Sequence, residues 1–193
     1  MPNPRLLIFN DGFTWEDLAD IPRGNIEVTC VPNGERARLL SAIPDFDAYM
    51  PSLRLRVDAE VLAAAKKLKL IASNATGTDH FDLPLLEQRK ITLLTIKHDR
   101  ELLDQVPTTA ELAFGLLLTC ARHLPECFAA TRQGYWGRQQ FAGLQLAGRT
   151  LGIIGVGRLG TMLSQYGRAF RMRVLAHDPF QSKLPEGVEM TSL

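Results

Sequence analysis

Three glycines at fixed spacing form the clearest chemical signal in the sequence. Gly155, Gly157 and Gly160 make a G-x-G-x-x-G pattern between an apolar run and a helical pattern. In that context the first glycine allows a tight turn, the second lets a ligand approach the backbone, and the third lets the helix pack on the strand. The free amides that open the helix, near Arg158 and Leu159, present partial positive charge to an anion. The pattern predicts a binding site for the pyrophosphate of a dinucleotide.

An acidic residue at the end of the next strand pattern fits the same site. Asp178 follows Gly160 by 18 residues and closes the apolar segment 173–178. A carboxylate there can accept hydrogen bonds from both hydroxyls of the adenosine ribose, and its negative charge would repel a 2′-phosphate. NAD is therefore the expected cofactor, in preference to NADP. The alternative is that the glycines serve packing alone and that Asp178 is an ordinary strand-end acid.

The elements that would position these residues alternate along the chain. Strands are expected at 5–10, 26–31, 46–50, 69–73, 91–96, 148–155 and 173–178, and helices at 57–68, 83–90, 107–136 and 158–170. Turns are expected at 10–12 and 32–34, and Pro125 is expected to kink or split the longest helix. This alternation predicts an α/β protein with a parallel sheet.

The polar segment 97–106 fits no element and marks a boundary between two domains, 1–100 and 101–193. The first carries five of the strand patterns, and the second carries the long helix and a single βαβ unit. The run 148–155 is apolar throughout, which is typical of a strand buried on both faces. The tail after Pro179 is too short for another βα unit.

Composition narrows the classes of protein. The chain has 193 residues, a formal net charge of +1 and scattered basic residues, so neither a nucleic-acid surface nor a polybasic membrane patch is expected. No apolar run approaches membrane-spanning length. Three cysteines without a C-x-x-C pair argue against a disulfide framework or a zinc site, so we expect no metal and a reduced, cytoplasmic setting.

Several motifs, taken in order, resemble those of the D-isomer-specific 2-hydroxyacid dehydrogenases. They are LKLIASNATGTDHFDL at 68–83, PTTAEL at 107–112, GYW at 134–136, LAGRTLGIIGVGRLG at 146–160 and HDP at 177–179. The resemblance implies a flavodoxin-like substrate domain, followed by the first βαβ unit of an incomplete Rossmann-type parallel sheet, with the active site in the cleft. It also implies an NAD-dependent oxidoreductase that acts on small D-2-hydroxy or 2-oxo acids, and a homodimer formed through the Rossmann domain and the helix near 107–134.

The same resemblance assigns further site residues. Backbone amides near Ala75, Thr76 and Gly77 would hold the substrate carboxylate, since small residues let amides converge on an anion. The alternative there is an ordinary βα loop. Thr108 would approach the nicotinamide end of the cofactor, and its alternative is a helix cap. Ser73 stands where many relatives carry Arg, which alters how the loop would handle a carboxylate or phosphate.

The catalytic machinery of that family lies in motifs that would follow Leu193. Hydride transfer there relies on an Arg, a Glu and a His, and no catalytic residue is assigned within this chain. We therefore expect a fragment or truncated form that is inactive or nearly so, with exposed strand edges that favour association. The alternative function is a non-catalytic NAD-binding or regulatory module derived from the same family.

Overall fold

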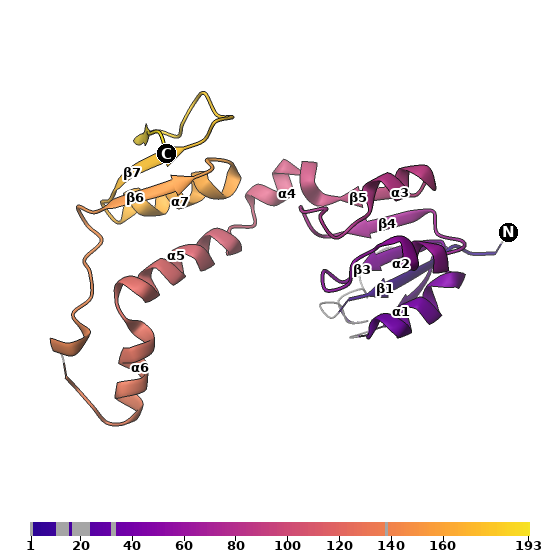
Figure 1. Cartoon of the computed structure of the whole chain (residues 1–193), viewed down its shortest axis with the longest axis horizontal. Coiled ribbons are helices and arrows are strands. Elements are labelled where there is room, and N and C mark those ends of the chain that lie inside the picture. The colour runs from indigo at the N-terminus through magenta and orange to yellow at the C-terminus, as the bar shows by residue number, and fades with distance from the viewer. Residues whose placement is uncertain (1, 11–15, 17–23, 32–33, 138) are drawn as a thin grey trace. The chain divides into compact units, whose positions relative to one another are not determined.

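Two parallel sheets organise the chain, one in each of two units (Figure 1). The computed structural model describes residues 2–10, 16, 24–31, 34–137 and 139–193. Unit 1 spans Met1–Arg100 and unit 2 spans Glu101–Leu193. The turns expected at 10–12 and 32–34 lie partly outside the described residues.

Unit 1 is built around a five-stranded parallel sheet in the order β2-β1-β3-β4-β5. Its strands are β1 (Arg5–Phe9), β2 (Glu27–Cys30), β3 (Ala48–Pro51), β4 (Leu70–Ser73) and β5 (Thr92–Thr95). Its helices are α1 (Arg36–Ala42), α2 (Ala59–Ala64) and α3 (Leu83–Gln88), with short 3-10 helices η1 (Ile43–Asp45) and η2 (Ile96–His98). This strand order is the flavodoxin-like one, so the expected fold class is confirmed for this unit.

Side-chain caps begin helices α2 and α3. Asp58 accepts hydrogen bonds from the amides of Glu60 and Val61, both at 3.2 Å, at the start of α2. Asp82 accepts one from the amide of Leu85 at 3.2 Å, at the start of α3. Each bond satisfies an amide that the helix itself leaves unpaired, and so it stabilises the first turn of its helix.

Helix α1 is an element that the sequence pattern does not predict. Leu39 is its one buried residue, so its apolar stripe is too short to show a period. A contact distant in sequence holds it in place: the guanidinium of Arg36 lies 2.6 Å from Asp58 and 2.8 Å from Glu60. The segment 97–106, which matches no pattern, likewise contains a short helix.

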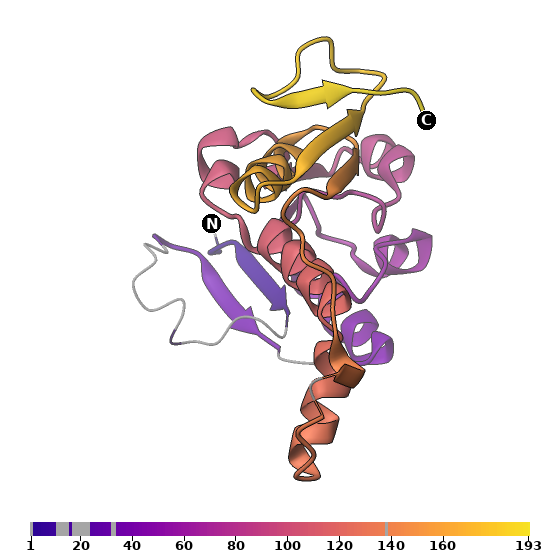
Figure 2. The same cartoon turned by 90° about the vertical axis from the view of Figure 1, so that its left-hand side faces the viewer.

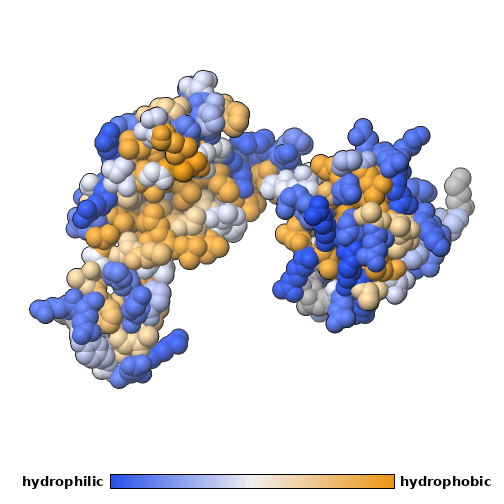
Figure 3. Space-filling model, in the orientation of Figure 1, coloured by the Kyte–Doolittle hydropathy of each residue, from blue (hydrophilic) through white to orange (hydrophobic). Residues whose placement is uncertain are grey.

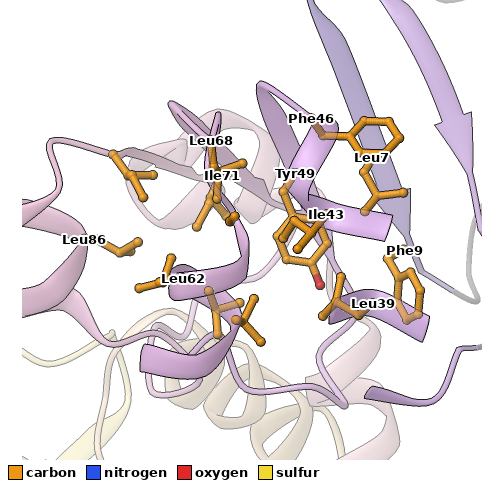
Figure 4. Close-up of a cluster of buried hydrophobic side chains, with 14 of the residues drawn as sticks. Leu7, Phe9, Leu39, Ile43, Phe46, Tyr49, Leu62, Leu68, Ile71 and Leu86 are labelled. Carbon is orange, nitrogen blue, oxygen red and sulfur yellow. The ribbon is translucent and has the colours of Figure 1, made fainter. Parts of the chain in front are cut away.

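The core of unit 1 is one hydrophobic cluster between the sheet and its helices (Figure 4). Tyr49 is fully buried in it, with its ring near Leu39 and Ile43. Burial raises the pKa of the Tyr49 hydroxyl, and among the described residues that hydroxyl has no hydrogen-bond partner. An unpaired buried hydroxyl costs about 1–3 kcal/mol, so this side chain is held by its ring and not by its polar end.

Unit 2 contains a three-stranded parallel sheet in the order β6-β7-β8. Its strands are β6 (Thr150–Ile154), β7 (Arg173–His177) and β8 (Val188–Met190). Its helices are α4 (Arg100–Asp104), which begins at the boundary, α5 (Thr108–Ala121), α6 (Leu124–Arg132) and α7 (Arg158–Ala169), with the 3-10 helix η3 (Gln139–Phe141). The elements β6, α7 and β7 form the expected βαβ unit.

The tail after Pro179 forms no further βα unit, as expected, but it contains strand β8, which the sequence pattern does not predict. Strand β8 pairs directly with β7 (Figure 2), and Arg173 of β7 makes an ion pair with Glu189 of β8. One expectation for unit 2 is wrong. The run 148–155 is not buried on both faces, since Ile154 is 77% exposed. Strand β6 lies at the edge of the sheet, and α7 is the helix that packs on the sheet within the described residues.

The long helical pattern 107–136 forms two helices, which confirms the expected break. Helix α5 ends at Ala121, and α6 begins with Pro125 in its first turn. Between them His123 has a left-handed backbone conformation, with φ of 51°. The helices consequently follow different directions (Figure 1). Proline fits the first turn of a new helix because its missing amide would be unpaired there.

Membrane-spanning and metal-binding features are both absent from the part of the chain that the structure describes. None of the helices there has both the length and the hydrophobicity to span a bilayer. No group of three or more His, Cys, Asp or Glu side chains among those residues could hold a metal ion.

The orphan hydroxyl of Tyr49 generates a stability prediction. Tyr49→Phe should raise the free energy of unfolding of unit 1 by about 1 kcal/mol, because it removes the unpaired group and keeps the ring. Urea titration followed by circular dichroism measures this change. Tyr135→Phe, at an exposed position, is the control and should change the value by less than about 0.5 kcal/mol. A loss of stability on Tyr49→Phe would mean that the hydroxyl has a favourable interaction.

Candidate functional site

The register of two parallel strands brings their carboxyl ends together in unit 2. Ile154 pairs with His177, and the amide of Gly155 donates a hydrogen bond to the His177 carbonyl at 2.8 Å. Asp178 is the next residue, so its carboxylate lies beside the turn that follows β6. Ligands of open parallel sheets bind outside the carboxyl ends of the strands, which is where this turn lies.

Asp178 is tied to the glycine turn through the main chain. Its Oδ2 accepts the amide of Val156 at 2.7 Å, and its Oδ1 accepts the amide of Phe180 at 2.9 Å. These donors, Val156 first, hold the pKa of the Asp178 carboxyl below its ordinary value. The group is therefore ionised at neutral pH, and each oxygen keeps acceptor capacity for a ligand hydroxyl.

The structure gives a different reason for glycine at each of the three positions. Gly155 has φ of +88°, a conformation that side chains disfavour. At Gly160 a Cβ atom would lie 2.1 Å from the Gly155 carbonyl oxygen, so the start of α7 approaches β6 closely because no side chain intervenes. At Gly157 a Cβ would meet nothing within 4 Å. The fold requires glycine at 155 and 160, whereas position 157 faces open space that a ligand can use.

The N-terminus of α7 offers main-chain donors to that space. Gly157 is the N-cap and supplies no side-chain hydrogen bond to the helix. The amides of Arg158, Leu159 and Gly160 therefore start the helix without a side-chain cap. Such amides, together with the helix dipole, favour an anion placed near them.

The side chain of Arg158 has partners that the sequence does not indicate. Its Nη1 donates to the carbonyl oxygens of Leu103 and Val106, at 2.6 and 2.8 Å. Both acceptors are main-chain groups more than 50 residues away in sequence. No residue type signals such acceptors, so sequence reasoning assigned only the amide of Arg158.

Thr108 is the first residue of α5 and is exposed. The N-cap of that helix is Pro107, and no side chain caps it, so the alternative of Thr108 as a helix cap is wrong. Thr108 follows Val106 by two residues, and the Arg158 contact therefore brings the start of α5 near the start of α7.

The loop after β4 in unit 1 holds the residues assigned to the substrate carboxylate. Ser73 is buried, and its Oγ accepts the amide of Ala75 at 3.2 Å. Ala75 is half-buried, whereas Thr76 and Gly77 are exposed. The amide of Ala75 thus already has an acceptor within the chain, and no acceptor among the described residues pairs with the amides of Thr76 and Gly77. The hydroxyl of Ser73 orders this loop locally.

Comparison with known proteins matches both units to one family. Residues 8–133 match the profile "D-isomer specific 2-hydroxyacid dehydrogenase, catalytic domain", and residues 114–193 match "D-isomer specific 2-hydroxyacid dehydrogenase, NAD binding domain". The second match confirms NAD as the expected cofactor. It covers the glycine turn and Asp178.

Two curated relatives illustrate the likeness in sequence. The D-3-phosphoglycerate dehydrogenase of Archaeoglobus fulgidus is 36% identical over 169 residues, which are 87% of this chain and 31% of that protein. The hydroxypyruvate reductase of Thermotoga maritima is 32% identical over 159 residues, 82% of this chain and 50% of that protein. The chain therefore spans about a third to a half of the length of these relatives.

Solved structures extend the likeness to the fold. The TT0316 protein from Thermus thermophilus superposes with a TM-score of 0.81 at 32% identity, over 97% of this chain and 60% of that one. The NAD-dependent formate dehydrogenase from Staphylococcus aureus, solved in complex with NAD, has the same TM-score at 18% identity and the same coverage. The second likeness is one of fold alone.

The contrast between Gly157 and Gly160 generates a paired stability prediction. Gly160→Ala should lower the free energy of unfolding of unit 2 by about 3 kcal/mol, because its Cβ cannot fit against the Gly155 carbonyl. Gly157→Ala should lower it by less than about 1 kcal/mol, since its Cβ enters open space. Urea titration compares the two variants, and equal losses would contradict the close approach of α7 to β6.

The hydrogen bond between Asp178 and Val156 generates a pH prediction. A lowered pKa means that the folded state binds the proton less tightly than the unfolded state, so this stabilisation is complete above about pH 4 and is lost as the pH falls through the folded value. The amide resonance of Val156 in a ¹⁵N-correlated NMR spectrum should report that titration below about pH 4. Asp178→Asn should abolish it, and a midpoint at or above the ordinary value in the wild-type chain would contradict the contact.

Proposed function

The chain belongs to the D-isomer-specific 2-hydroxyacid dehydrogenase family, and on that basis we propose that unit 2 binds NAD within an oxidoreductase of D-2-hydroxy acids and 2-oxo acids. The contact of Asp178 with the Val156 amide carries the proposal. It holds a carboxylate against a glycine turn whose helix amides face open space. That combination suits a ligand with a diphosphate next to a ribose.

Each assigned residue has a role in the proposal. The amides of the turn and of the helix start hold the pyrophosphate, Asp178 accepts the hydroxyls of the adenosine ribose, and Thr108 approaches the nicotinamide end. The residues around the pyrophosphate are Gly155, Gly157, Arg158, Leu159 and Gly160. The negative charge of Asp178 disfavours a 2′-phosphate, which makes NAD the preferred cofactor over NADP. The open space at Gly157 supports this fit.

The substrate part of the proposal concerns unit 1. Amides of Ala75, Thr76 and Gly77 hold the carboxylate of a small 2-hydroxy or 2-oxo acid. The exposure of Thr76 and Gly77 supports this role. The amide of Ala75 must break its hydrogen bond to Ser73 Oγ before it can bind the carboxylate, so this bond lowers the affinity for the ligand.

Turnover is proposed to need residues beyond 1–193. Bound NAD supplies the hydride acceptor or donor, and the residues of this chain bind and orient it. The family resemblance assigns the Arg, Glu and His of proton transfer to none of residues 1–193, so we propose that residues 1–193 by themselves bind NAD without turning over. The non-catalytic alternative, a binding or regulatory module, differs in that the activity would stay absent when the remaining domain is supplied.

We also propose association as a homodimer in the cytoplasm. Large apolar side chains of unit 2 are exposed, including Leu112 and Leu116 on α5 and Phe128 on α6. Figure 3 shows hydrophobic side chains spread over the face of this unit that is turned to the viewer. Exposed apolar surface of this kind favours association. None of the three cysteines, which all lie among the described residues, forms a disulfide, which agrees with a reducing compartment.

Calorimetric titration with NAD tests the proposed function. The wild-type chain should bind NAD more tightly than NADP, and Gly157→Ala should weaken NAD binding at least about tenfold by placing a Cβ where the pyrophosphate lies. Gly152→Ala is the matched control, since its Cβ also meets nothing within 4 Å but lies inside β6. It should leave the affinity unchanged.

The same preparations separate binding from catalysis. Oxidation of NADH with a panel of 2-oxo acids should be negligible for residues 1–193 and should appear when the remaining domain of a family member is fused after Leu193. Absence of NAD binding in the wild-type chain, or equal effects of Gly157→Ala and Gly152→Ala, would contradict the proposed cofactor site. Binding without activity in the fused protein would favour the regulatory module.

A further inference from the structure

One side chain connects the glycine turn to the segment with which unit 2 begins. Arg158 begins α7, and its Nη1 donates to the carbonyl oxygens of Leu103 and Val106. The amide of Val106 donates in turn to the Leu103 carbonyl at 3.1 Å. The guanidinium therefore holds both ends of the single turn 103–106, which closes α4 and leads into α5.

Electrostatics favour the contact between the Arg158 guanidinium and these two carbonyls. The last carbonyls of a helix carry partial negative charge, and a cationic donor on them is stabilising. Hydrogen bonds from a charged donor are also stronger than neutral ones. Helix α4 has five residues and is too short to persist by helix propensity alone. The conformation of 103–106 therefore depends on contacts outside the segment, among them the two bonds from Arg158 and the burial of Leu103.

The geometry of the guanidinium leaves room for a ligand. Nη1 makes both bonds to carbonyls, and within the described residues Nη2 and Nε of Arg158 donate none. An arginine has five N–H donors, so three of them stay available to an anion at the turn. A phosphate that reaches Nη2 or Nε can engage Arg158 without breaking the contacts of Nη1 to Leu103 and Val106.

We propose that Arg158 is a positioning residue that couples occupation of the glycine turn to the conformation of residues 103–107. The inference rests on the proposed binding of NAD at that turn. A ligand that orders the start of α7 also orders the guanidinium attached to it, and the turn 103–106 is then protected along with the site. The coupling is reciprocal. If NAD binding stabilises the turn 103–106 through Arg158, then loss of the Arg158 contact weakens NAD binding by the same factor.

Hydrogen exchange of the whole chain, measured by mass spectrometry with and without NAD, tests the coupling. Arg158→Gln should speed exchange in peptides covering 103–108 by about tenfold without ligand, since the turn loses the two hydrogen bonds from the guanidinium. Arg168→Gln is the matched control: Arg168 lies on the same helix and donates to the carbonyl of Glu186. It should speed exchange near 186 and leave 103–108 unchanged.

The ligand arm separates this inference from the proposed function. In the wild-type chain NAD should slow exchange both at 155–162 and at 103–108, and in Arg158→Gln it should slow exchange at 155–162 alone. Protection of 155–162 alone in the wild-type chain overturns the coupling and leaves NAD binding intact. Protection of neither segment overturns both. If Arg158→Gln loses protection in β6 and so unfolds, Arg158→Lys, which keeps the charge, replaces it and should show the same pattern at reduced size.

Discussion

The approach of helix α7 to the end of strand β6 is the constraint on which unit 2 depends. It occurs at Gly160, where a Cβ would lie 2.1 Å from the carbonyl oxygen of Gly155. This closeness aims the first amides of the helix at the space beside Gly157, where no atom would oppose a Cβ. A side chain at position 160 would hold α7 farther from β6. The first amides and the positive end of the dipole of α7 would then lie away from the space beside Gly157.

Main-chain groups are the partners of both charged side chains at this site. Asp178 accepts the amides of Val156 and Phe180, and Arg158 donates to the carbonyls of Leu103 and Val106. Each side chain thereby ties its own element to a main-chain segment elsewhere in unit 2. The site is ordered by a carboxylate and a guanidinium that each keep unused hydrogen-bonding capacity, which is what a ligand needs from them.

The two units differ in how fully they bury their sheets. The five-stranded sheet of unit 1 packs a large cluster that includes Leu7, Tyr49 and Ile71, and within it the Tyr49 hydroxyl finds no hydrogen-bond partner among the described residues. The core of unit 2 is small, with Ile153, Val174 and Ala176 among its buried members, and Ile154 on its edge strand stays largely exposed. This exposed apolar surface is the observation that supports the proposed association of unit 2.

The sequence by itself determined the alternation of strands and helices, the glycine turn at 155–160 and the acid at 178, because each depends on neighbours in the chain. Helix α1, strand β8 and the partners of Arg158 were decided by the tertiary structure. They depend on contacts such as that of Arg36 with Asp58, of Arg173 with Glu189, and of a guanidinium with two carbonyls. Every residue has a main-chain carbonyl, so residue types do not predict which carbonyl a distant arginine will bind.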